Sequence, residues 1–421
     1  MNVRIHPKKL SGSLVVPPSK SLSHRAIIAA SLAKGKSIIS NVILSKDILA
    51  TIDGMRALGA EITINGNQVI IHGNSIERKS NLIDANESGS TLRFLIPIAL
   101  VSNLPICFTG KNHLVHRPLD SYFEIFDSLG ISYSHEEGQY LPLHIHGGLR
   151  PDTYHLRGDV SSQFITGLLY ALPLLNGDSK IVITTELESK GYIDLTLDIL
   201  KQFGIQIRHN NYQEFMIAGN QSYQPFNYTV EGDYSQVAFF LVAGALGADL
   251  KLYGMREDSY QGDKKIIQDI LSMKGNLELH PEYISCRPGK TIGATIDFSQ
   301  SPDLGPALTV LASLSEGTTE FVKASRLRIK ECDRITCMKE ELEKMGASIE
   351  ENSDGMKIYG VDELHGAVVD SHNDHRVAMA LAVASLKTKG DIVIMNAGCV
   401  AKSFPNFWDV FQSLGGDISY E

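Results

Sequence analysis

The sequence is poor in several features that define whole classes of protein. Its 421 residues contain one tryptophan and five cysteines, an odd number with no C-x-x-C pair. That set argues against a disulfide framework and against a zinc ribbon, so we expect reduced thiols. No run of eighteen apolar residues occurs, and the opening MNVRIHPKKL leads into no apolar core of a signal peptide. We therefore expect a cytoplasmic chain with no membrane partner.

Positive charge is also scarce. The chain carries 39 Lys and Arg against 48 Asp and Glu, a formal net charge of -9 at pH 7. Binding along a phosphate backbone needs a basic surface, so the sequence argues against a nucleic-acid partner. Any anionic ligand must instead be bound by a local group of cations. With 43% hydrophobic residues, a chain of this length can bury an ample core.

A helix-to-strand boundary recurs six times along the chain. Phrases such as MRALGAEIT, LKQFGIQIR and FQSLGGDIS each read as the end of an amphipathic helix, a glycine and an alternating strand. A glycine at this point can adopt the left-handed conformation that ends many helices. The six glycines stand 69 to 74 residues apart and are Gly59, Gly130, Gly204, Gly275, Gly346 and Gly415. We therefore predict six repeated units that fill the chain.

Each predicted unit also contains a second helix that is apolar on nearly every side, as in SHRAIIAASLA and DHRVAMALAVASL. Such a helix belongs in the interior. Units of about seventy residues are longer than the usual solenoid repeat, so we expect them to group as three plus three. Pro306 fits a first helical turn, whereas Pro97 predicts a kink or a later start. The helices should start near Ser23, Ser90, Ser161, Ser235, Asp303 and Asp374, most of which are good N-cap residues.

Cationic and polar side chains gather at these helix starts. The stretch PPSKSLSHR places Lys20, Ser21 and Arg25 directly before or within the first turns of a buried helix. Helix N-termini present free N–H groups and a partial positive charge, which suits an anion. If the buried helices point the same way, their starts can face one site. We therefore predict a binding site for phosphate or carboxylate groups at these helix starts.

Other interpretations stay open for each motif taken alone. PPSKS lacks both glycines of a P-loop, and its prolines cannot donate N–H groups to phosphate. Ser161 and Ser162 can be simple N-caps. His372 and His375 suggest a metal pair, but no third ligand stands nearby in the sequence. The segment RIKECDR can be a solvated helix start, and Lys402 an ordinary surface lysine.

The motifs PPSKSLSHR, ESGSTLR, HRPLD, GDVSSQFITGLL, ESKGYID, VEGDYSQ, RIKECDR, NDHR and CVAKSFP occur in this order. In them the chain resembles, over essentially its full length, the family of 5-enolpyruvylshikimate-3-phosphate synthases, or 3-phosphoshikimate 1-carboxyvinyltransferases. The resemblance implies an α/β fold of two lobes, an inside-out α/β barrel in which each lobe holds three ββαβαββ-type units around buried helices. It places the lobes at residues 18–229 and at 1–17 with 230–421, and the active site in the cleft between them.

The family moves the enolpyruvyl group of phosphoenolpyruvate to the 5-hydroxyl of shikimate 3-phosphate and releases phosphate. The resemblance implies two sets of binding residues and one catalytic set. Those for shikimate 3-phosphate are Lys20, Ser21, Arg25, Ser161, Ser162, Gln163, Ser189, Tyr192, Asp303 and Lys330. Those for phosphoenolpyruvate are Lys20, Gly89, Arg117, Gln163, Arg334, Arg376 and Lys402. The catalytic set is Asp303, Glu331, Lys20 and His375, in which Asp303 accepts the hydroxyl proton and Glu331 serves the methylene carbon.

The resemblance implies no metal and no organic cofactor, and we expect a monomer whose partners are these two small molecules. The chain departs from the best-known members where Phe94 replaces a proline and where Arg326 stands in place of an asparagine. The sister family that acts on UDP-N-acetylglucosamine carries a loop cysteine that GKNHLVHRP lacks. A phosphometabolite-binding protein without turnover would have no use for two carboxylates among its cations.

Overall fold

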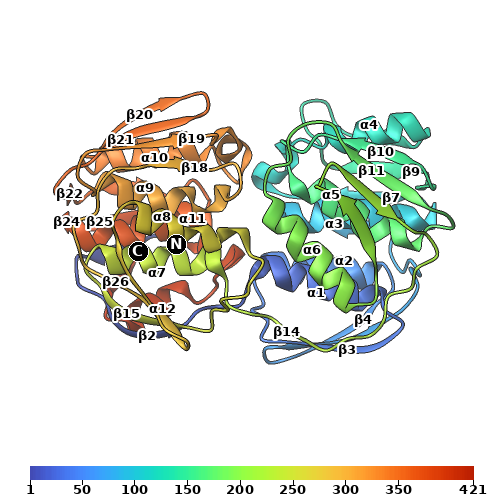
Figure 1. The fold of residues 1–421 in the computed structure, drawn as a ribbon, viewed down its shortest axis with the longest axis horizontal. Helices are drawn as coiled ribbons and strands as arrows, with labels where there is room; N and C mark the ends of the chain where they lie inside the picture. The colour runs from blue at the N-terminus through green and yellow to red at the C-terminus, as the bar shows by residue number, and fades with distance from the viewer. The chain divides into compact units, whose positions relative to one another are not determined.

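The computed structural model describes residues 1–421, which divide into two compact units (Figure 1). Unit 1 comprises Met1–Ser19 with Glu231–Glu421, and unit 2 comprises Lys20–Val230. The chain therefore passes between the units twice. The structure contains no helix with the length and hydropathy needed to span a bilayer.

Unit 2 contains six α-helices and twelve strands. The helices are α1 (Lys20–Leu32), α2 (Lys46–Ala57), α3 (Gly89–Ala99), α4 (Asp120–Leu129), α5 (Ser162–Ala171) and α6 (Lys190–Gln202). The strands are β3 (Gly35–Ser40), β4 (Glu61–Asn65), β5 (Gln68–Gly73), β6 (Leu82–Asp84), β7 (Ile106–Thr109), β8 (Ser132–Ser134), β9 (Leu143–His146), β10 (Thr153–Leu156), β11 (Ser179–Ile183), β12 (Ile207–Asn210), β13 (Glu214–Ile217) and β14 (Tyr228–Thr229).

Unit 1 contains six α-helices and fourteen strands. The helices are α7 (Tyr234–Ala245), α8 (Ile266–Ser272), α9 (Gly305–Ser313), α10 (Arg334–Lys344), α11 (His375–Ala384) and α12 (Phe407–Ser413). The strands are β1 (Val3–His6), β2 (Ser11–Val15), β15 (Asp249–Tyr253), β16 (Asn276–Leu279), β17 (Tyr283–Arg287), β18 (Thr295–Asp297), β19 (Thr318–Val322), β20 (Ser348–Asn352), β21 (Gly355–Tyr359), β22 (Leu364–His365), β23 (Val368–Asp370), β24 (Thr388–Lys389), β25 (Ile392–Met395) and β26 (Asp417–Tyr420).

Six four-stranded sheets share one topology. In the second repeat the chain runs β6-α3-β7-α4-β8-β9, and the sheet order is β6-β7-β9-β8. The first pair of strands is parallel and the other two pairs are antiparallel. The other five sheets repeat this pattern, with β1 and β2 from the amino-terminal segment completing two sheets of unit 1. Strand β14, from the end of unit 2, completes the sheet of the first repeat. The second, third and fifth repeats run βαβαββ along the chain, one strand shorter than the ββαβαββ pattern expected and within the α/β fold class predicted.

The apolar helices lie in the interiors of the units. In unit 1, α7, α9 and α11 pack against one another, and the strands surround them (Figure 1). In unit 2, α3 packs on α5, while α1 packs on α2 and α6. Nearly every residue of α1, α3, α5, α7, α9 and α11 is buried. Their starts are therefore the parts of these helices that remain available for polar chemistry.

The N-caps agree with the expectation at two starts and differ at the others. Ser161 and Asp374 cap α5 and α11 through their side chains. All six helices start within three residues of the predicted positions, but Ser88 and Asp233, not Ser90 and Ser235, accept the N–H groups at the starts of α3 and α7. Asp303 caps no helix, since it lies in the short 3-10 turn Pro302–Leu304 before α9.

The prolines and the boundary glycines test the backbone conformations that the sequence predicts. Pro306 stands in the first turn of α9, as predicted. Pro97 lies inside α3, which begins at Gly89, so the later start was wrong. Five of the six boundary glycines have positive φ, but at the fourth boundary Lys274 takes φ +56° instead of Gly275. Helix α8 ends at Ser272, and a Cβ on Gly275 would lie 2.3 Å from Cγ2 of Ile270. Close packing, not the left-handed conformation, requires glycine there.

Candidate active site

The residues predicted for the site fall into two clusters, one in each unit. The unit 2 cluster consists of Lys20, Ser21, Arg25, Gly89, Arg117, Ser161, Ser162, Gln163, Ser189 and Tyr192. The unit 1 cluster consists of Asp303, Lys330, Glu331, Arg334, His375, Arg376 and Lys402.

Lys20 is the first residue of α1, and its ammonium is held by a neighbouring helix. Its Nζ lies 2.8 Å from Oδ2 of Asp47, and both side chains are largely buried. Asp47 stands in the first turn of α2, whose N-cap is Ser45. A carboxylate at a helix N-terminus is stabilised by the helix dipole, so Asp47 is well placed to hold a cation. The pair fixes Lys20 at the mouth of α1.

Arg25 lies one turn further into α1 and is 2% exposed. Its guanidinium donates to the carbonyls of Ser21 and Tyr192 at 2.9 and 3.0 Å and to Oγ1 of Thr196 at 2.9 Å. The rings of Phe94 and Tyr192 lie 5.2 and 5.9 Å from its Cζ. Burial lowers the pKa of Arg25. Phe94 therefore supplies one face of the Arg25 site.

Gly89 begins α3, and its missing side chain makes room for Arg117. A Cβ on Gly89 would lie 2.4 Å from Nη1 of Arg117 and 2.9 Å from its Cζ. Real Cβ contacts are not this short, so any side chain at this position would displace the guanidinium. Because Gly89 has no side chain, Arg117, a residue predicted to bind phosphoenolpyruvate, can lie directly against the start of α3.

Gln163 joins two buried helix starts. Its Oε1 accepts from Nη1 of Arg93 at 2.8 Å, and its Nε2 donates to Oγ of Ser90 at 3.0 Å. Both partners belong to α3, whereas Gln163 is in the first turn of α5. Ser161 accepts the Gln163 N–H at 3.3 Å, which makes Ser161 an N-cap. Capping leaves Ser161 available as a hydrogen-bond donor through its hydroxyl hydrogen.

Two further serines of the unit 2 cluster occupy helix starts. Ser162 is the first residue of α5 and is 4% exposed. Ser189 precedes α6, is fully buried and has φ +56°. A serine in the left-handed region is strained, and such residues gather at ligand sites. The main chain of Ser189 accepts from the N–H of Tyr192 at 3.1 Å, which ties this turn to the Arg25 site.

Asp303 is the centre of the unit 1 cluster. Its Oδ1 lies 3.2 Å from Nζ of Lys330 and 2.9 Å from Nη1 of Arg334, and its Oδ2 lies 3.1 Å from Nη2 of Arg376. Burial opposes ionisation of the carboxylate, but the charges of Arg376, Lys330 and Arg334 outweigh burial and hold its pKa well below the ordinary value. Three positions more than twenty residues away in sequence thus converge on one carboxylate.

Arg334 is held on two sides by carboxylates. Its Nε lies 2.8 Å from Oδ2 of Asp374, and its side chain is 2% exposed. Burial disfavours the charged guanidinium, but Asp374 and Asp303 raise the pKa of Arg334. Asp374 also accepts the N–H of Arg376 at 2.8 Å as the N-cap of α11. One buried aspartate therefore orients the Arg334 side chain and caps the helix that carries Arg376.

Glu331 forms the second carboxylate site of unit 1. A hydrogen bond of 3.0 Å joins its Oε2 to Nδ1 of His375, and Nζ of Lys402 lies 3.5 Å from the same oxygen. Side-chain atoms of Glu331, Asp374 and His375 that could ligate a metal lie within 4.8 Å of one another. Asp374 is already neutralised by Arg334, and Lys402 adds positive charge, so this environment suits an anion better than a cation.

Sequence reasoning missed three residues that hold the predicted ones. Asp47 anchors Lys20, Arg93 orients Gln163, and Asp374 orients Arg334 and caps the helix that begins with His375 and Arg376. Asp374 was predicted only as a helix start, and Arg93 lies within the motif ESGSTLR without a predicted role. Asp47 carried no sequence signal beyond a Ser-Lys-Asp helix start. Arg326 is 6% exposed in the turn before Lys330, so its side chain belongs to the interior of unit 1.

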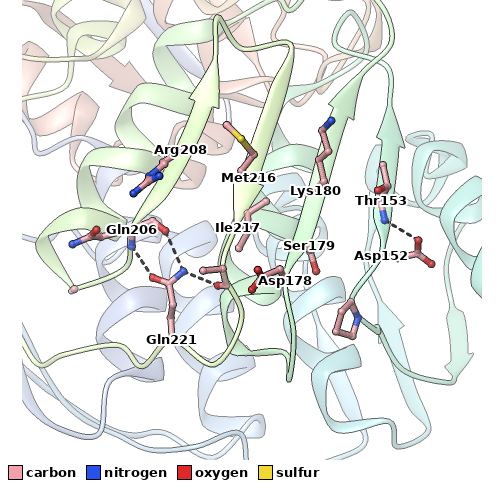
Figure 2. A pocket seen from close by; sticks show the side chains of 13 residues that line it. Asp152, Thr153, Asp178, Ser179, Lys180, Gln206, Arg208, Met216, Ile217 and Gln221 are labelled. Atoms are coloured by element: carbon pink, nitrogen blue, oxygen red, sulfur yellow. Dashed lines mark hydrogen bonds between the residues drawn. The ribbon is translucent and has the colours of Figure 1, made fainter.

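A concave surface elsewhere in unit 2 contains none of the predicted residues. Figure 2 shows it on one face of the sheet β10-β11-β13-β12, where Thr153, Lys180, Met216 and Arg208 form a row of cross-strand neighbours. Lys180 is paired with Glu214 at 2.5 Å. Asp152, Asp178 and Arg208 also line this hollow.

Three comparisons identify similar proteins. A family model described as EPSP synthase (3-phosphoshikimate 1-carboxyvinyltransferase) matches residues 5–411. A 3-phosphoshikimate 1-carboxyvinyltransferase of Clostridium perfringens is 52% identical over 100% of this chain and 99% of that protein. The protein of the same name from Clostridioides difficile is 49% identical over 99% of this chain and 98% of its own.

Solved structures agree with the sequence matches. An EPSP synthase from Acinetobacter baumannii superposes with a TM-score of 0.81 at 26% identity and covers 100% of both chains. The enolpyruvyl transferase NikO from Streptomyces tendae also has a TM-score of 0.81, at 17% identity over 100% of this chain and 98% of its own, which shows the shared fold. With the family model spanning almost the whole sequence and half of all residues identical in a curated relative, this chain belongs to the EPSP synthase (3-phosphoshikimate 1-carboxyvinyltransferase) family.

Proposed function

We propose that this chain is a transferase that moves the enolpyruvyl group of phosphoenolpyruvate to the 5-hydroxyl of shikimate 3-phosphate and releases phosphate. This reaction belongs to the shikimate pathway, which leads to chorismate and the aromatic amino acids. The observation that carries the proposal is the cluster around Asp303, in which a buried carboxylate is surrounded by Lys330, Arg334 and Arg376, within a full-length family match. Two multiply anionic substrates need such cations.

The binding roles follow the two clusters. In our proposal the shikimate 3-phosphate ligands are Ser21, Arg25, Ser161, Ser162, Gln163, Ser189, Tyr192, Lys330 and Asp303, with Lys20 shared. The phosphoenolpyruvate ligands are Gly89, Arg117, Arg334, Arg376 and Lys402, with Lys20 and Gln163 shared. Both sets draw on both units, so substrate binding would bring the two clusters together. The lobes at 18–229 and at 1–17 with 230–421 would close over the substrates.

Asp303 serves as the base that accepts the hydroxyl proton. Without substrate its three cationic partners depress its pKa, which makes it a weak base. Phosphoenolpyruvate would draw Arg334 and Arg376 toward its own negative groups, and shikimate 3-phosphate would draw Lys330. Each cation that turns to a substrate raises the basicity of Asp303. The base is therefore strongest when both substrates are bound.

Glu331 serves the methylene carbon on the other side of the reacting double bond. In the addition step the 5-hydroxyl oxygen attacks C2 of phosphoenolpyruvate while C3 gains a proton, which yields a tetrahedral intermediate. In the elimination step C3 loses a proton and the C2–O bond to phosphate breaks. His375 and Lys402, at 3.0 and 3.5 Å from Glu331, balance its charge through both proton transfers. Lys20, oriented by Asp47, assists from unit 2.

Further expectations belong to this proposal. The enzyme would work in the cytoplasm as a monomer without a metal or organic cofactor, and without binding nucleic acid or membranes. Small-angle scattering tests closure of the lobes: shikimate 3-phosphate should lower the radius of gyration, and an unchanged radius would count against closure.

The deciding experiment measures phosphate release from phosphoenolpyruvate and shikimate 3-phosphate. The parent protein should release phosphate, and Asp303→Ala should lower kcat by about 10²- to 10⁴-fold, the usual range for a lost acid/base group. Lys180→Ala, on the sheet face of Figure 2, is the matched control and should keep parental kinetics. No release by the parent protein would end the proposal. Release that depends on UDP-N-acetylglucosamine would support the sister transferase instead, and binding without release would indicate a non-catalytic protein.

A further inference from the structure

Two thiols stand directly behind the unit 1 cluster. Asp333 is the N-cap of α10, so Cys332 is the residue before the cap and Cys337 is the fourth helical residue. Residues at these two positions commonly pack together as a hydrophobic staple that fixes how the chain enters the helix. The two side chains are 9% and 6% exposed. In this chain the staple is built from a pair of cysteines.

A histidine and a glutamate lie beside Cys337. Cys332 and His372 both lower the pKa of the Cys337 thiol and so favour its thiolate. Nε2 of His372 lies 2.7 Å from Oε1 of Glu341, which is 1% exposed. A thiol, an imidazole that can take its proton and a carboxylate that orients the imidazole form the arrangement that activates cysteine nucleophiles. Nothing in the proposed transfer reaction uses these groups.

The cysteines of the chain differ in the pKa of their thiols. The hydrogen bond with Cys332, opposed by burial and helped by His372, lowers the pKa of Cys337 to about 7. The hydrogen bond with Cys337 in turn raises the pKa of His372 to about 9. Burial raises the pKa of Cys286 and Cys399 to about 12. Because the thiolate is the reactive form, Cys337 is the cysteine best prepared to react near neutral pH.

The thiol pair is coupled to the residues of the candidate site. Sγ of Cys332 lies 3.8 Å from Oδ2 of Asp374, the carboxylate that orients Arg334. Cys332 also follows Glu331 directly in the chain. Any bond that moves Cys332 therefore moves the backbone of Glu331 and the hydrogen bonding of Asp374.

We propose that Cys337 and Cys332 are an oxidation site, a dithiol that a hydroperoxide converts into a disulfide and that thereby switches off the unit 1 cluster. The Cys337 thiolate attacks hydrogen peroxide, its sulfur is oxidised to a sulfenic acid, and the O–O bond breaks to give hydroxide, which takes up a proton and leaves as water. The Cys332 thiol then attacks the sulfenic sulfur, a second water leaves, and the disulfide forms. A dithiol reductant reverses the change. The side chain of His372, 29% exposed, connects the buried pair to solvent.

This site goes beyond the proposed transferase activity and has a readout that does not depend on it. Trypsin cleaves after Lys330, Arg334 and Lys339, so the two cysteines fall in the separate peptides ECDR and ITCMK. The full chain is treated with hydrogen peroxide, its remaining thiols are alkylated, and it is digested with trypsin. The masses of the peptides are then measured by mass spectrometry. The expected product is ECDR joined to ITCMK by a disulfide, which disappears after treatment with dithiothreitol.

Variants separate the two steps. In Cys332→Ser the disulfide cannot form, and dimedone should trap the sulfenic acid on Cys337; trapping is needed because Met338 in the same peptide also gains oxygen. His372→Asn should slow oxidation of Cys337, since it removes the partner that supports the thiolate. Cys286→Ser, which changes a buried thiol of β17, is the matched control and should oxidise like the parent chain.

The rate of phosphate release shows whether the disulfide disturbs the unit 1 cluster. A displacement of reacting groups by about 1 Å can cost about 10²-fold in rate. We expect a loss of that size on oxidation, full recovery with dithiothreitol, and resistance in Cys332→Ser and Cys337→Ser. Absence of the joined peptide at excess peroxide, or oxidation only at Cys399, overturns the proposal. A joined peptide with unchanged phosphate release overturns the switch.

Discussion

Replacing Asp303 by asparagine tests whether the unit 1 cluster is held together by charge. The asparagine would keep the size of the side chain but remove the charge shared by Lys330, Arg334 and Arg376. The side chains of Arg334 and Arg376 are 2% and 6% exposed, so water cannot replace the lost carboxylate. The substitution should therefore destabilise unit 1 as well as remove the base.

The expected loss in free energy of unfolding depends on which contacts the two arginines keep in the variant. Breaking a buried ion pair by removing one partner costs about 3 to 5 kcal/mol, because an uncompensated charge is left behind. Arg334 keeps its contacts with Asp374. We therefore expect the lower end of that range, about 3 kcal/mol. The exposed pair Lys323–Asp297 provides the control, since Asp297→Asn should change the stability by about 1 kcal/mol or less.

The single tryptophan makes the measurement specific to unit 1. Trp408 is 4% exposed in α12, and unit 2 contains no tryptophan. Its fluorescence during urea unfolding reports the free energy of unfolding of unit 1 for the parent chain and for each variant. If Asp303→Asn and Asp297→Asn shift the urea midpoint equally, the charge argument is refuted.

The pH dependence gives an independent check. A carboxyl whose pKa is depressed in the folded chain stabilises the fold above its unfolded pKa of about 3.9 and loses that stabilisation as the pH falls through the folded pKa. The stability difference between parent and Asp303→Asn should thus be constant from about pH 5 to pH 8 and shrink below about pH 4. A difference that already disappears between about pH 7 and pH 5 would contradict the depressed pKa.

Three further substitutions test other parts of the structure. Burial, with repulsion from Asp303, raises the pKa of Asp263 to about 6, so ionisation of Asp263 destabilises the fold above that pH. Asp263→Asn should stabilise unit 1 by up to about 3 kcal/mol at about pH 8, a gain that declines as the pH falls through about 6 toward 4; a gain that grows in acid would refute it. Lys274→Gly should raise the urea midpoint of Trp408 fluorescence by the equivalent of about 0.5 kcal/mol, because glycine adopts positive φ without strain; a lower midpoint would show that Lys274 is not strained. Phe94→Leu removes the ring that faces Arg25 at 5.2 Å and should raise KM for shikimate 3-phosphate several-fold with little change in KM for phosphoenolpyruvate; equal changes in both would contradict the assignment of Arg25.

The repeat could be predicted because it rests on local chemistry. The boundary glycines, the alternating strands and the apolar helices each leave a signal within a short stretch of sequence, and five of the six glycines have positive φ. The fourth boundary shows the limit of that reasoning. There α8 ends early, Lys274 takes the left-handed conformation, and Gly275 is required by its contact with Ile270. Only tertiary packing distinguishes these two causes.

The contacts that orient the site residues could not be predicted from the sequence either, because they also depend on tertiary packing. Lys20 and Asp47 are 27 residues apart, and Gly89 and Arg117 are 28 apart. Each contact depends on how neighbouring helices pack, which no motif records. The motifs marked the residues that were expected to touch substrate. The residues that hold them, such as Asp374 and Arg93, became apparent only from hydrogen bonds across helices.

The position of the charges follows from the fold. A buried helix carries charge most readily near its start, because a charge in its middle is desolvated unless it has a partner there. In six repeats of one architecture, the helix starts are therefore the places where the sequence can differ without disturbing the core. Lys20, Gly89, Ser162 and His375 all stand at such starts, and Asp303 lies in the turn that leads into α9. The same constraint explains why unit 1 holds its arginines with Asp303 and Asp374 before any substrate is bound. In the proposed mechanism the substrates take over the cations that surround Asp303, and Asp303 then becomes available for proton transfer.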